Sequence, residues 1–68
     1  MNRTRYTVVF ERGDRPHQWL AAVKELPHCH TYGHGIVKTR AHIREALAVW
    51  VGDAAASTAE LVEELPRA

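Results

Sequence analysis

Histidines are the residues of this chain whose type and spacing could do chemistry. The 68 residues include five histidines, and four of them lie between His28 and His42. Alternate residues of an extended segment share a face, so His28 and His30 would project together, with His34 not far beyond. Three imidazoles could bind zinc or nickel. The intervening residues interrupt this set and no carboxylate is placed to orient a ring, so we expect no cofactor and keep a metal site as an alternative.

Cys29 precedes His30, and a cysteine beside a histidine could act as a nucleophile. Adjacent residues of a strand face opposite sides, however, so these two side chains cannot share a hydrogen bond there. We therefore expect Cys29 to be a small buried thiol under a helix.

The size and composition indicate one small domain over residues 1–68. Nine Lys and Arg against eight Asp and Glu leave a formal charge of +1, which argues against a dedicated polyanion binder. One cysteine excludes an internal disulfide framework. The longest apolar run, residues 46–51, is too short for a membrane span or a signal peptide. We expect a reduced, soluble, cytoplasmic protein with no membrane partner.

The first half of the chain predicts three antiparallel strands. β-branched and aromatic residues favour a strand at about 4–11, and Gly, Asp and Pro then form a turn. The short connection pairs it with a second strand at about 17–25. Pro27 breaks that run, and a third short strand fits at about 29–33.

The second half predicts one long amphipathic helix at about 36–51. Its apolar stripe recurs at three- and four-residue spacing and is formed by Ile36, Thr39, Ile43, Ala46, Leu47 and Trp50. The tail, 54–68, is open to two interpretations. Ser57–Glu60 fits a capping box before a helical turn, whereas 61–65 fits an edge strand parallel to the first, with the helix as a right-handed crossover. We favour the strand, which gives an α+β fold.

Both faces of the predicted sheet are partly apolar. Tyr6 and Val8 point one way, whereas Thr7 and Val9 point the other. One helix can cover only one face, so we expect the chain to associate with itself as a dimer or higher oligomer. The alternative is that Thr7, Val9 and Ala22 are only scattered exposed residues.

A set of residues in a fixed order connects these elements to a known family. The set is a Tyr-Thr-Val-Val-Phe-Glu strand from Tyr6, a Gly-Asp turn, Trp19, the residues Glu25, Leu26, Pro27, Cys29, His30, Thr31 and Gly33, and a helix that contains Ala46 and Leu47. With this order and spacing, residues 6–51 resemble the HicB family of antitoxins.

The resemblance implies a partial ribonuclease-H-like fold and a protein partner. That partner is a small basic HicA-type toxin that cleaves mRNA with a histidine, and the antitoxin binds it and covers its active site. On charge alone, the candidate partner-binding residues are Glu11, Glu60, Glu63 and Glu64. Many family members carry a C-terminal DNA-binding motif, but residues 52–68 are too few for a helix-turn-helix, so we do not expect direct DNA binding.

Four alternatives can be weighed against toxin binding. Ribonuclease-H chemistry needs several carboxylates around two metal ions, and no such set is visible, so we expect no enzyme. The helical cations Lys38, Arg40 and Arg44 have no interleaved aromatic residue for stacking on bases, which argues against nucleic-acid binding. A histidine-rich metal-binding protein and an orphan dimerising domain without a toxin remain as alternatives.

Overall fold

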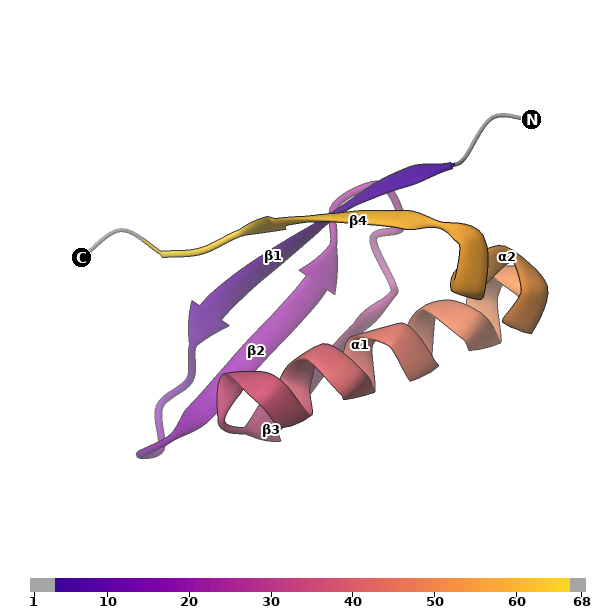
Figure 1. Ribbon diagram of the computed structural model, residues 1–68. Coiled ribbons are helices and arrows are strands. Elements are labelled where there is room, and N and C mark those ends of the chain that lie inside the picture. The colour runs from indigo at the N-terminus through magenta and orange to yellow at the C-terminus, as the bar shows by residue number, and fades with distance from the viewer. Residues whose placement is uncertain (1–3, 67–68) are drawn as a thin grey trace.

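Four strands form one mixed sheet, and a long helix lies across one of its faces (Figure 1). The computed structural model describes residues 4–66. In chain order the elements are β1 (Arg5–Arg12), β2 (Gln18–Val23), β3 (His30–His34), α1 (Ile36–Val51), α2 (Asp53–Thr58) and β4 (Glu60–Glu64). The predicted α+β fold is confirmed.

The strand order is β3-β2-β1-β4. β1 pairs antiparallel with β2, and β2 pairs antiparallel with β3. β4 returns beside β1 in parallel, with Thr7 opposite Val62, so the predicted fourth strand is confirmed within one residue of its expected bounds. The second strand is shorter than predicted because His17 adopts φ +63° in the turn before it and residues 24–28 turn after it.

The capping-box interpretation of Ser57–Glu60 is wrong. Ser57 and Thr58 lie in the last turn of α2, and their hydroxyls donate to the Ala54 carbonyl at 3.0 and 3.1 Å. These side chains therefore bond back into the helix that they end, instead of capping a helix that follows. Glu60 then begins β4.

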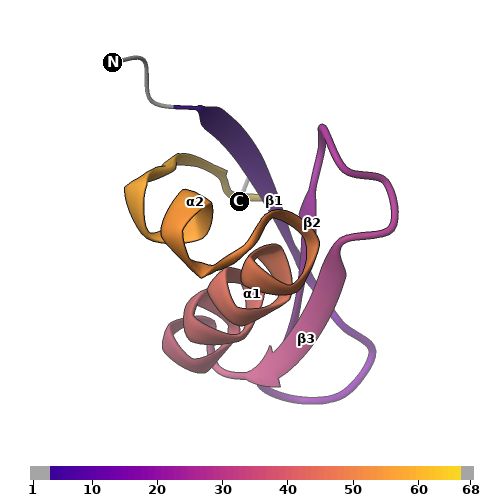
Figure 2. The same cartoon turned by 90° about the vertical axis from the view of Figure 1, so that its right-hand side faces the viewer.

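The core lies between the sheet and α1. Figure 2 looks along α1 and shows it on one side of the strands. β1 contributes Val8 and Phe10, which are buried against Ile43 and Leu47 of the helix. The other buried apolar residues are Ala21, Val23, Cys29, Ala56 and Ala59.

β3 and α1 approach each other closely at Gly33. A Cβ at this position would lie 2.7 Å from Thr39 Oγ1, so any larger residue would force the helix and strand apart. Thr39 is fully buried, and its hydroxyl donates to the Gly35 carbonyl at 2.8 Å. Thr39 is the one buried polar residue among residues 4–66, and its hydroxyl is thereby satisfied within the first turn of α1.

The expectation that Trp50 belongs to the buried stripe is wrong, because its side chain is 55% exposed. The buried line of α1 runs at four-residue spacing through Thr39, Ile43 and Leu47, and continues to half-buried Val51. Four-residue steps drift by about 40° around the helix, so the buried direction at the last turn is that of Val51, and Trp50 lies about 100° around the helix from Val51. Its ring stacks instead on His28, with 6.4 Å between centroids.

Neither helix within residues 4–66 combines the length and the hydropathy that crossing a bilayer would require.

The contrast between Leu47 and Trp50 gives a stability prediction. Leu47→Ala should lower the free energy of unfolding by about 2–5 kcal/mol, because it leaves a cavity in the core. Trp50→Ala should cost less than about 1 kcal/mol, because the ring is largely in water. Urea denaturation measures both, with exposed Val49→Ala as the control. A Trp50→Ala loss as large as that of Leu47→Ala would contradict the assignment of Trp50 to the surface.

Candidate protein-docking face

The sheet face opposite α1, here called the open face, is covered by no other element of the described chain. Residues paired across strands share a face, so the register defines its rows. One row runs Glu64, Val9, Ala22 and His30, from β4 to β3. A second runs Glu11, Leu20 and Tyr32.

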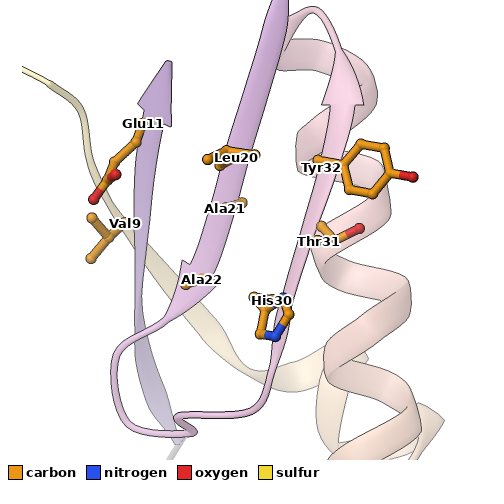
Figure 3. Close-up of a pocket in the computed structure, with 8 residues that line it drawn as sticks. All are labelled: Val9, Glu11, Leu20, Ala21, Ala22, His30, Thr31 and Tyr32. Carbon is orange, nitrogen blue, oxygen red and sulfur yellow. The ribbon is translucent and has the colours of Figure 1, made fainter. Parts of the chain in front are cut away.

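A hollow of about 310 Å³ lies at the centre of the open face. Figure 3 shows its lining side chains on three strands, with α1 behind them. Those that face outward are Val9, Glu11, Leu20, Ala22, His30 and Tyr32. The hollow forms because the Ala22 side chain, which lies between Val9 and His30, is too small to fill the space between them. Leu20 and Tyr32 beside it are 38% and 66% exposed, so the hollow offers apolar and aromatic surface to a partner.

Glu11 is the candidate carboxylate that borders this hollow. It belongs to none of the ion pairs found within residues 4–66, so its charge is free to meet a cation from a partner. Such a carboxylate at the rim of an apolar face favours a basic partner and disfavours an acidic one.

The three candidate carboxylates of β4 are each matched by a cation of this chain. Glu60 accepts a hydrogen bond from Arg5 Nε at 2.6 Å, and Glu64 lies 3.6 Å from Lys24 Nζ. These are exposed ion pairs, which contribute little to stability and can exchange partners. The sequence shows an acidic C-terminal segment, but the sheet brings it beside basic residues that are distant in the chain.

Glu63 differs from the other candidates because it lies on the helix side of the sheet. Both of its oxygens accept hydrogen bonds from Arg40 of α1, at 2.7 and 2.9 Å. Hydrogen bonding to Glu63, together with the charge of its carboxylate, raises the pKa of the Arg40 guanidinium. Glu63 therefore ties β4 to α1, while Glu11, Glu60 and Glu64 lie on the open face.

The histidines proposed as metal ligands are not brought together. His28 stacks on Trp50, whereas His34 lies at the other end of β3 against His17, with ring centroids 5.2 Å apart. Across residues 4–66 no three His, Cys, Asp or Glu side chains are grouped so that they could hold a metal ion. Cys29 is fully buried, and burial raises the pKa of its thiol.

Most residues that carry the family resemblance build the fold. Tyr6, Trp19 and Leu26 pack against the core, and Thr31 and Gly33 are on the helix side of β3. Ala46 and Leu47 place α1 on the sheet, and Pro27 lies in the turn between β2 and β3. Within this set His30 and Thr31 line the hollow, and His30 is the one whose register places it on the open face.

Glu25 holds the loop between β2 and β3 against β1. Its carboxylate accepts hydrogen bonds from the Thr7 backbone N–H at 2.7 Å and from the Thr7 hydroxyl at 3.0 Å. The backbone hydrogen bond is the main reason that the pKa of Glu25 is lowered. Spacing alone does not reveal this contact, because Thr7 and Glu25 are distant in sequence.

Comparison of the chain with protein-family models, curated proteins and solved structures found no match. The resemblance to HicB antitoxins therefore rests on the residues named above.

Glu25 gives a prediction on pH dependence. Because its folded pKa lies below the ordinary value of about 4.5, its contribution to stability is present above that pH and is lost as the pH falls through the folded pKa. Glu25→Gln should therefore be less stable than the wild type near neutral pH, and the difference should shrink toward about pH 3. Thermal unfolding midpoints over this range measure it, with the exposed Glu45→Gln as control. A difference that is independent of pH would contradict the assignment.

Proposed function

We propose that this chain is a HicB-like antitoxin that acts in the cytoplasm by binding a small basic HicA-type toxin. The observation that carries the proposal is the open face, where an apolar hollow is bordered by Glu11, whose carboxylate is in no ion pair within the described chain. The resemblance of residues 6–51 to HicB antitoxins and the α+β architecture support it. The mechanism is steric cover, so it needs no chemistry from this chain.

The open face suits such a partner in two ways. Burying Leu20 and the Tyr32 ring removes apolar surface from water, which supplies most of the driving force of association. Glu11 then selects a partner that presents a cation, and Glu60 and Glu64 can exchange their exposed ion pairs for contacts with the same partner. Apolar burial provides affinity, and the rim carboxylates provide specificity.

We also propose that two copies cover each other's open faces when no toxin is bound. The row from Glu64 through Val9 and Ala22 to His30 has an acid at one end and an imidazole at the other. A two-fold axis parallel to the strands would place the β4 side of one copy over the β3 side of the next, so these ends would meet. Toxin and second copy would then compete for one surface.

Leu20→Glu tests both uses of the open face. Co-expressed with the product of the neighbouring small gene, the wild type should co-purify with it and restore growth, and Leu20→Glu should do neither, because a charge is buried at the centre of the interface. Light scattering after size exclusion should find the wild type as a dimer or larger and the variant as a monomer.

Val49→Glu is the matched control, because Val49 is an apolar residue of α1 that is 85% exposed. It should behave as the wild type in each measurement. Full toxin neutralisation by Leu20→Glu would overturn the assignment of the face. A wild type that dimerises through this face but neither co-purifies with the neighbouring gene product nor restores growth would favour the orphan dimerising domain.

A further inference from the structure

A second hollow, here called the edge groove, lies on the other side of β3 from the open face hollow. It is a groove of about 620 Å³, open to solvent, between the turn that joins β1 to β2, the outer edge of β3 and the first half of α1. Its volume is within the usual range for small-ligand pockets. The toxin-binding proposal makes no use of it.

The charged side chains that line the edge groove are both cations. Arg15 lines it from the turn and Lys38 from the first turns of α1, and no carboxylate of residues 4–66 is among its lining residues. Three cations of the described chain are neutralised in ion pairs, but Arg15 and Lys38 are not among them. α1 also begins here with no acidic residue in its first turn, so the positive end of the helix dipole is not offset.

Two imidazoles add hydrogen-bonding groups to the same groove. His42 Nδ1 lies 2.9 Å from the carbonyl oxygen of Tyr32, which can only accept, so Nδ1 carries the proton and donates. This bond fixes the His42 ring on the groove wall. His34 lines the groove from β3, with the His17 ring beside it.

The backbone of β3 also directs donors outward. Gly35 N–H donates to His17, and Val23 N–H donates to the Cys29 carbonyl, so the odd-numbered residues bond inward to β2. Tyr32 and His34 alternate with them, and their N–H groups therefore point to the outer edge. Oxyanions are bound in proteins by such N–H groups together with Arg and Lys.

Tyr32 distinguishes this groove from a simple anion site. Its side chain is 66% exposed and lines the groove, and Figure 3 shows the ring projecting from β3 on the side away from β2. An exposed aromatic ring beside cations is the arrangement on which nucleotide bases stack. The sequence does not interleave an aromatic residue with the helical cations, but the fold places Tyr32 of β3 and Lys38 of α1 on the lining of one groove.

We propose that the edge groove binds a nucleotide, with its phosphate between Arg15 and Lys38 and its base against Tyr32. A free nucleotide and a single strand of RNA offer the same chemistry. The proposal goes beyond toxin binding, because Arg15 and Lys38 lie off the open face. Tyr32 lines both hollows, so a toxin that buries its ring would compete with the base for it.

Fluorescence anisotropy with a labelled ten-residue oligouridylate tests the strand, and NMR titration with adenosine monophosphate tests the free nucleotide. Arg15→Glu and Lys38→Glu should each weaken binding about tenfold or more and lower its dependence on salt, because each removes a phosphate contact. Tyr32→Ala should weaken it about fivefold or more, whereas Tyr32→Phe, which keeps the ring, should bind as the wild type does.

Arg44→Glu is the matched control, because Arg44 is an exposed cation of the same helix and borders a different hollow, beside Glu63. It carries the same charge change as Arg15→Glu and should leave affinity within about twofold. Binding of the oligouridylate alone would identify a strand as the ligand, and binding of both probes would show that one nucleotide suffices. The proposal would be overturned if neither probe bound, or if Arg44→Glu weakened binding as much as Arg15→Glu does.

Discussion

The packing of α1 on one face of the sheet is the contact on which the rest of the structure depends. It buries Phe10 and Val8 against Leu47 and Ile43, and it is close because Gly33 admits the Thr39 hydroxyl. Within residues 4–66, α1 is the only long helix, and it covers one face of the sheet. The outward residues of the same strands, Leu20 among them, are therefore left in water by the same contact that buries their neighbours.

The parallel return of β4 beside β1 decides how charge is distributed. It brings Glu60 to Arg5 and Glu63 to Arg40, so the acidic end of the chain is neutralised along that edge of the sheet. The opposite edge, at β3, receives Arg15 and Lys38 without carboxylate partners in the described chain. A formal net charge of +1 thus conceals an uneven surface, because Arg15 and Lys38, which are in no ion pair of the described chain, both line the β3 edge.

The sequence predicts the four strands and α1 because their signals are local, but it does not predict α2 at 53–58. Alternation defines the strands, and three- and four-residue spacing defines α1 over the same bounds that the structure has. The errors arise where a local pattern has two continuations. Trp50 and Val51 follow Leu47 at three- and four-residue spacing, so either could continue its apolar stripe. The position of the sheet decides that Val51 is the one turned toward the core. The ion pairs and the edge groove are non-local, since Arg5 and Glu60 are 55 residues apart, so no spacing rule reveals them.

β3 shows how a small chain can use one strand for several purposes. Its inward residues, Thr31 and Gly33, are small, which lets α1 approach, and its outward residues, His30, Tyr32 and His34, are large. Because β3 is also an edge strand, Tyr32 has space on both sides and borders both hollows. A partner that buries the Tyr32 ring on the open face would remove it from the edge groove. The open-face hollow and the edge groove are therefore neighbours that share Tyr32. Leu20 lines only the first and Lys38 only the second, so substitutions at these two residues distinguish a function of one surface from a function of the other.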